Sequence, residues 1–156
     1  MAPVWLAAGV LAVAAVVLGA VLLVRDSGDA GGETEARRVA EEFSVVLSSY
    51  DYRRLDADLD KVKALGVGHF LYQYEAVLGG EAFRKTLVDN QAVATAKVIK
   101  GPFVAAFDGD QARVYTVLEQ RVEGRTPPEP TTRQVLVETM LVNTRDGWKV
   151  DWVELS

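Results

Sequence analysis

The chain is 156 residues long and carries 17 basic and 22 acidic side chains, which gives a net charge of −5 at pH 7. This acidic balance argues against a nucleic-acid partner, because nucleic acids are bound by basic stripes or patches. The sequence contains no cysteine, which excludes disulfides, thiolate metal sites and thiol catalysis.

An uncharged apolar run, Val4 to Val24, follows a short tail of residues 1–3. At about 1.5 Å of rise per residue, a helix of that length matches a bilayer hydrocarbon core of roughly 30 Å. A helix is required there because lipid offers no partners for backbone N–H and C=O groups. A cleaved signal peptide would need a basic residue before the run and a shorter apolar stretch. We therefore predict a single-pass membrane protein that contacts the bilayer through Val4 to Val24.

Residues 25–34 are polar and rich in glycine, which is typical of a flexible tether. Residues 35–156 have the length of one extramembrane domain. An excess of basic residues marks the cytoplasmic flank of a spanning helix. Here Arg25, Arg37 and Arg38 stand among acids on one flank, and only the α-amino group is basic on the other. This balance leans slightly towards a cytoplasmic domain without deciding the orientation.

Four segments in the first half of the domain repeat apolar side chains at helical spacing. Asp51 can cap the second segment, and Gly66 and Gly79 stand where the second and third segments end. The apolar stripes are Val39, Phe43, Val46, Leu47 and Tyr50; Leu55, Leu59 and Val62; Phe70, Leu71, Tyr74, Val77 and Leu78; and Phe83 and Leu87 within Glu81 to Val88.

From Ala92 onwards, valine, threonine and tyrosine dominate and polarity alternates, which is typical of half-buried strands. Asp108-Gly109-Asp110 and Arg145-Asp146-Gly147 predict hairpin turns, because glycine and aspartate tolerate positive φ. Prolines at 127, 128 and 130 predict a longer loop. Helices followed by an antiparallel meander favour the α+β class, with helices on one face of a curled sheet. The expected strands are Ala92 to Phe107, Gln111 to Glu123, Thr131 to Asn143 and Trp148 to Leu155.

The acidic residues Asp56, Asp58 and Asp60 are spaced closely enough to suggest a calcium loop. An EF-hand needs glycine at its sixth position and glutamate at its twelfth, whereas Lys61 and Val67 stand there. A helix would also separate the three carboxylates onto different faces. We expect a solvated acidic helix at this position, and no metal or cofactor.

Histidine occurs once, as His69, and no neighbour in sequence supplies it with a nucleophile or an orienting carboxylate. Tyrosines gather in the helical half, where they either fill the core or line an apolar pocket in the mouth of the sheet. The pocket alternative groups His69, Tyr72 and Tyr74 near an acid such as Asp151. The sequence has no phosphate-binding, dinucleotide-binding or hydrolase motif, so we expect a protein that is not an enzyme.

Two segments suggest a family: Ser49-Tyr50-Asp51-Tyr52-Arg53-Arg54-Leu55-Asp56-Ala57-Asp58-Leu59, and the late strand Gly147-Trp148-Lys149-Val150-Asp151. They resemble the actinobacterial Mce-associated (mammalian cell entry) membrane proteins. The resemblance implies a cone-shaped α+β domain of the nuclear-transport-factor-like superfamily, outside the cytoplasmic membrane, with an accessory role beside Mce lipid-import complexes. The same superfamily includes polyketide-cyclase-like enzymes and the inner-membrane assembly component of type IV secretion, so fold alone does not determine function.

No catalytic residue is carried over by this resemblance, since the shared motif is not a catalytic one. In physical terms the motif predicts an N-cap, aromatic packing and an arginine–carboxylate brace between helices. The leading hypothesis is a membrane-anchored scaffold that stabilises or assembles an Mce-type lipid transport complex through protein partners, with a homo-oligomer as one option. The alternatives are a small-ligand binder or polyketide-cyclase-like enzyme, and a type IV secretion-like assembly component. The candidate interaction residues are Tyr50, Asp51, Tyr52, Arg54, Leu55 and Asp56.

Overall fold

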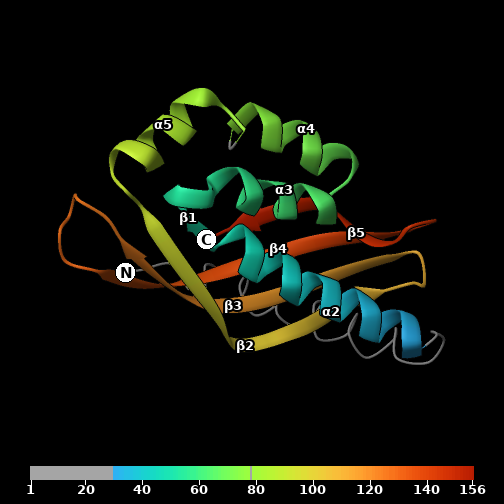
Figure 1. Cartoon of the computed structure of the whole chain (residues 1–156). Coiled ribbons are helices and arrows are strands. Elements are labelled where there is room, and N and C mark those ends of the chain that lie inside the picture. Colours follow the sequence, from blue (N-terminus) through green and yellow to red (C-terminus); the bar gives the residue numbers. More distant parts are fainter. Residues whose placement is uncertain (1–29, 78) are drawn as a thin grey trace, which may run out of the picture.

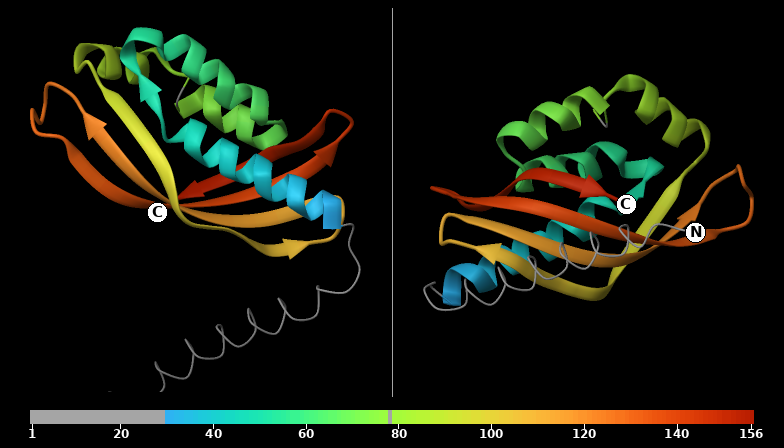
Figure 2. Two further views of the ribbon diagram at one scale, coloured as in Figure 1. Left: turned by 60° about the horizontal axis from the view of Figure 1, so that its bottom comes forward. Right: turned by 180° about the vertical axis from the view of Figure 1, so that it is seen from behind.

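The computed structural model describes residues 30–77 and 79–156. They form one antiparallel sheet in the order β1-β2-β3-β4-β5, with the α-helices gathered on one side of it (Figure 1). The sheet curls around α2, which lies across its concave face (Figure 2). This arrangement confirms the predicted α+β class. The elements are α2 (Ala30–Leu47), β1 (Tyr50–Asp51), the 3₁₀-helix η1 (Tyr52–Arg54), α3 (Leu55–Leu65), α4 (Gly68–Val77), α5 (Glu81–Asp89), β2 (Val93–Phe107), β3 (Gln111–Glu123), β4 (Thr131–Thr144) and β5 (Gly147–Leu155).

The predicted spanning segment, Val4 to Val24, lies outside the described residues, as does the tail 1–3. Over 30–77 and 79–156, the structure contains no helix that is long and apolar enough to cross a membrane.

Helix α2 begins earlier than the sequence predicts. It starts at Ala30, so residues 30–34 of the expected tether are helical and the folded domain includes them. Salt bridges within the first turns stabilise this end, with Arg37 Nη2 lying 2.8 Å from Glu33 Oε1 and Arg38 Nη2 lying 2.7 Å from Glu35 Oε1. These exposed pairs offset only part of the low helix propensity of the neighbouring glycines, since each pair contributes less than one helical glycine costs.

The carboxyl-terminal end of α2 also differs from the prediction. The helix ends at Leu47, and Tyr50 lies in the short strand β1, where it pairs with Ala94 of β2. The Ser49 hydroxyl accepts a hydrogen bond of 3.0 Å from the Ala96 N–H. This bond holds the connection between α2 and β1 against the sheet. Tyr50, the last residue of the predicted apolar stripe, therefore lies in a strand and not in the helix.

Each strand pairs with its neighbour in sequence, and both predicted hairpin turns are confirmed. In the β2–β3 turn, Asp108 Oδ1 accepts hydrogen bonds from the N–H groups of Asp110 at 3.0 Å and Gln111 at 2.7 Å. Gly147 follows the β4–β5 turn with a φ of 93°. A side chain would disfavour this left-handed backbone, which explains the glycine.

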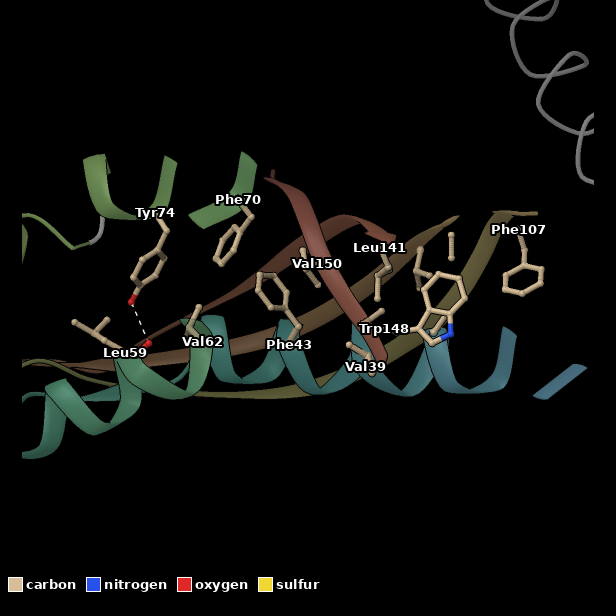
Figure 3. Packing of buried hydrophobic residues seen from close by; sticks show 14 of the residues in the cluster. Val39, Phe43, Leu59, Val62, Phe70, Tyr74, Phe107, Leu141, Trp148 and Val150 are labelled. Carbon is tan, nitrogen blue, oxygen red and sulfur yellow. Dashed lines mark hydrogen bonds between the residues drawn. The ribbon is translucent and has the colours of Figure 1, made fainter. Parts of the chain in front are cut away.

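The core fills the space between α2, α4 and the concave face of the sheet (Figure 3). Phe43 of α2 is fully buried and meets Phe70 of α4 edge to face, with ring centroids 5.0 Å apart. At the other end of α2, the rings of Phe107 and Trp148 lie 5.7 Å apart. Aromatic side chains therefore occupy much of the concave mouth of the sheet.

Helix α4 is attached to β5 at its first residues. The Val67 N–H donates to the Val150 carbonyl at 2.9 Å, and the His69 N–H donates to Asp151 Oδ1 at 3.0 Å. Between them Gly68 has a φ of +50°, and a Cβ built on it would collide with Asp151 Oδ1.

Gly68→Ala is expected to lower the free energy of unfolding by about 1–2 kcal/mol, because alanine pays for the left-handed backbone and displaces the Asp151 carboxylate. Urea unfolding of the full chain in mild detergent, followed by far-ultraviolet circular dichroism, measures the change. Gly109→Ala is the matched control, since Gly109 also has a positive φ but nothing lies within 4 Å of its built Cβ. Equal losses in both variants would show that the contact with Asp151 contributes nothing.

Candidate functional site

The segment from Ser49 to Leu59 forms one corner of the domain, where β1, η1 and α3 follow each other without a loop. Asp51 is the N-cap of η1, and its side chain accepts a 3.0 Å hydrogen bond from the Arg53 N–H. The Arg53 guanidinium also donates to both carboxylate oxygens of Asp51, from Nε at 2.8 Å and from Nη2 at 2.6 Å. The predicted N-cap is therefore correct, although the helix that it caps is a 3₁₀ turn.

The hydrogen bonds from Arg53, its side chain first and its backbone second, lower the pKa of Asp51 from 3.8 to about 2. Because the folded-state pKa lies below the unfolded one, ionised Asp51 stabilises the fold above pH 4 and loses this effect as the pH falls through about 2. We expect Asp51→Asn to be less stable than the wild type at pH 7 and equally stable near pH 2. Thermal unfolding at both pH values checks this, with Asp146→Asn in the β4–β5 turn as control. A difference between Asp51→Asn and the wild type that persists unchanged to pH 2 would contradict the assignment.

Asp58 is buried, with only 7% of its side chain exposed, so the prediction of a solvated acidic helix is wrong at this position. Its Oδ2 accepts a 3.0 Å hydrogen bond from the Asp51 N–H and lies 3.4 Å from Arg54 Nε. Its Oδ1 lies 3.3 Å from Lys61 Nζ. The carboxylate thus ties β1 to α3, and the cations on either side of it supply the charge that allows its burial.

A brace between helices exists, but a different arginine forms it. Arg54 pairs with Asp58 four residues later, whereas the ion pair that joins two helices links Arg84 of α5 to Asp56 of α3. Lys63 Nζ, 2.7 Å from Glu75 Oε1, joins α3 to α4 in the same way. Arg84 lies far from the motif in sequence, which is why the motif alone could not reveal it.

The aromatic and apolar residues of the motif occupy different depths. Leu55 is buried in the core. Tyr50 is partly buried, and this burial raises the pKa of its hydroxyl against the opposing effect of the Arg133 charge. The guanidinium carbon of Arg53 lies 5.7 Å from the centroid of the Tyr52 ring, which is a cation–π arrangement at the surface.

An open cleft of about 520 Å³ lies between η1 and α5. Its lining consists of Tyr52, Arg53, Arg54, Leu55, Asp56, Ala57, Arg84 and Val88. A second cleft, of about 290 Å³, lies between β1, α3 and the start of β2 and exposes Arg54 and Lys61. Below it, an apolar cavity of about 50 Å³ between α2, α3 and α5 is lined mainly by aliphatic side chains.

The predicted pocket of His69, Tyr72 and Tyr74 is not formed. His69 is exposed and Tyr72 is 78% exposed, whereas Tyr74 is buried and donates from its hydroxyl to the Leu59 carbonyl at 3.4 Å. Residues two apart on a helix point to different sides, so Tyr72 and Tyr74 cannot line one pocket. Asp151 does approach His69, but it accepts from the backbone N–H and not from the imidazole.

Burial, and secondarily the charges of Glu75 and Asp60, raise the pKa of Tyr74 to about 12, so its hydroxyl stays protonated at neutral pH. Over residues 30–77 and 79–156, no three histidine or acidic side chains are grouped so that they could hold a metal ion. The charged residues of the segment from Ser49 to Leu59 instead meet in the ion pairs at the η1–α3–α5 corner.

No protein-family model and no curated protein matches the chain, but solved structures do. An IcmL-like type IV secretion system protein from Legionella pneumophila superposes with a TM-score of 0.69 over 83% of this chain and 94% of its own, at 11% identity. The periplasmic domain of DotI gives 0.62 over 80% and 94%, at 13% identity. A nuclear transport factor 2-like superfamily protein from Salmonella enterica gives 0.52 over 76% and 90%, at 16% identity. This chain therefore has the nuclear-transport-factor-2-like fold that its sequence led us to expect.

Proposed function

We propose that this chain is a non-enzymatic assembly component of an envelope transport complex of the type IV secretion kind, with its α+β domain outside the cytoplasmic membrane. The observation that carries the proposal is the likeness to an IcmL-like secretion protein over most of both chains. The match to a periplasmic domain, that of DotI, supports the extracytoplasmic side. The sequence prediction of a spanning segment at Val4 to Val24 supports attachment to the membrane.

The interior of the domain supports a docking role better than a ligand-binding role. Phe43, Phe70 and Tyr74 fill the concave side of the sheet, where a small ligand would otherwise enter. The apolar cavity between α2, α3 and α5 measures about 50 Å³, whereas small-molecule sites usually measure about 300–1,000 Å³. The polar hollows instead open onto the surface, where the ion-paired side chains of η1, α3 and α5 can meet another protein.

Purification of the tagged full chain from its native membranes in mild detergent tests the proposal. We expect subunits of a secretion or transport complex to be recovered with it, and their levels to fall when the chain is deleted. A version that keeps residues 1–29 but carries an unrelated domain is the control for contacts made by the membrane segment alone. Recovery of the chain by itself, with transporter levels unchanged by deletion, would contradict the assembly role.

An accessory role in Mce-type lipid transport is the second candidate, and the segment from Ser49 to Leu59 favours it through its resemblance to Mce-associated proteins. The same purification separates the two candidates, since lipid-import subunits and secretion subunits differ in sequence. Protease treatment of intact protoplasts tests the orientation, because only an extracytoplasmic domain is cleaved from outside. The size of the purified assembly tests whether the chain forms a homo-oligomer, the option that the sequence left open.

A further inference from the structure

We propose that the cleft between η1 and α5 binds an acidic segment of a partner protein, whose carboxylates pair with Arg53, Arg54 and Arg84. This inference rests on the proposed assembly role and names the chemistry of one contact within it. The cleft is lined by residues from η1, the start of α3 and the outer face of α5, so three elements shape it.

Arginines outnumber carboxylates in the lining of the cleft. Three arginines and a single carboxylate, that of Asp56, line it, whereas the whole chain has a net charge of −5. Asp51 and Asp58 stand behind the cleft and hold Arg53 and Arg54 in place. The carboxylates that balance Arg53 and Arg54 are thus largely buried, whereas the two guanidinium groups are exposed at the cleft and favour an anionic group there over a neutral one.

The guanidinium groups keep free donors for such a partner. The closest approach of Arg54 to Asp58 is from Nε to Oδ2 at 3.4 Å, and Arg84 is paired with Asp56 through Nη2. Among the described parts of the chain, no other residue forms a hydrogen bond or ion pair with these two side chains. A guanidinium presents five donors in a planar fork, so each can still bind a carboxylate with two parallel hydrogen bonds.

Arg53 contributes a fixed edge to the cleft. Asp51 holds its guanidinium through two oxygens, and the Tyr52 ring lies beneath it. A side chain that is already ordered loses less conformational entropy on binding than a free one. The cleft is thus partly organised before a partner arrives.

Apolar groups between the arginines define the rest of the ligand. Val88 is 48% exposed, and Leu55 and Ala57 line the cleft beside it. An aliphatic or aromatic side chain next to an acidic residue would cover this surface. The recognised sequence therefore combines acidic and apolar residues.

The place of the cleft in the fold favours a protein over a lipid headgroup. It lies beyond the carboxyl-terminal end of α2, at the opposite end of the domain from Ala30 (Figure 1). Helix α2 has 18 residues, which at 1.5 Å per residue separates its two ends by about 27 Å. Because the predicted spanning segment precedes Ala30 in sequence, a cleft at the far end of α2 favours a protein ligand over a lipid headgroup.

A photo-crosslinking amino acid at Val88 of the full chain in native membranes tests the inference. We expect a protein adduct, and peptide mapping should place it within a few residues of an aspartate or glutamate. Arg84→Glu should weaken the adduct about tenfold, which corresponds to one lost charged hydrogen bond replaced by repulsion. Lys85→Glu is the matched control, since it makes the same charge change one residue along α5 outside the cleft lining.

A second variant, Arg54→Gln, separates the loss of a cleft arginine from any disturbance of α5 that the glutamate at position 84 causes. Thermal unfolding of each variant verifies that the domain remains folded. An adduct with lipid, an adduct that Arg84→Glu and Arg54→Gln leave unchanged, or the absence of any protein adduct would overturn the inference. If complex subunits still co-purify with the chain in any of these cases, the assembly role stands and only the acidic ligand is wrong. If neither the protein adduct nor the co-purifying subunits are found, the proposed function is wrong as well.

Discussion

Phe43→Ala is expected to lower the free energy of unfolding by about 3–5 kcal/mol, the usual cost of removing a buried aromatic ring. Phe43 is 0% exposed and packs edge to face against Phe70, with centroids 5.0 Å apart. It also joins α2 to the sheet in the same cluster as Val150 and Leu141. The cavity left by alanine would therefore lie where α2, α4 and the sheet pack against one another.

Urea unfolding of the full chain in mild detergent measures this loss through tryptophan fluorescence and circular dichroism. Tyr72→Ala is the matched control, since it removes an aromatic ring that is 78% exposed on α4 and should change stability by less than about 0.5 kcal/mol. Comparable losses in the two variants would mean that Phe43 is not the centre of the core.

Asp58→Ala is expected to lower the free energy of unfolding by about 2–3 kcal/mol. The substitution leaves the Asp51 N–H without the acceptor that now lies 3.0 Å away. It also leaves Arg54 and Lys61 close together without the carboxylate between them. Because both cations are largely exposed, the loss should stay below that expected for a fully buried ion pair.

Two controls separate the hydrogen bond from the charge. Asp58→Asn keeps an acceptor for the Asp51 N–H but removes the charge, so it should recover about half of the loss. Asp60→Ala removes an exposed carboxylate from the same helix, and it should have almost no effect on stability. If Asp58→Ala is as stable as Asp60→Ala, the carboxylate does not tie β1 to α3.

The sheet could be predicted closely from the sequence because its signals are local. Alternating polarity placed all four long strands, and the aspartates and glycines of both hairpin turns act within a few residues of their position in the chain. The pairing of each strand with its neighbour in sequence then left few alternatives for the topology.

The ends of α2 could not be predicted in this way. Gly31 and Gly32 suggested a tether, but they form the first turn of a helix that is held by the burial of its face from Ala36 onwards, with ion pairs from Glu33 and Glu35 to the next turn adding to this. Tyr50 matched the helical period, yet its place in β1 depends on Ala94, which lies far along the chain. Tertiary pairing overrode the local pattern there.

At the candidate site, the sequence indicated the segment but not its geometry. Asp58 is spaced like its exposed neighbours, and only the fold shows that it is buried under β1. Arg84 belongs to another helix, so its contact with Asp56 required the packing of α5 on α3. Conversely, His69 and Tyr72 were candidates for a pocket by residue type alone, and both side chains are exposed.

The contact between α2 and β5 constrains the order of events during synthesis. Val39 and Phe43 of the first described helix share a cluster with Trp148 and Val150 of the last strand (Figure 3). At 5–20 residues per second, a ribosome needs on the order of 5–20 s to pass from Phe43 to Val150. Throughout that interval the part of the α2 face that packs on β5 has no partner. The core of the domain is therefore completed only after its last strand has been synthesised.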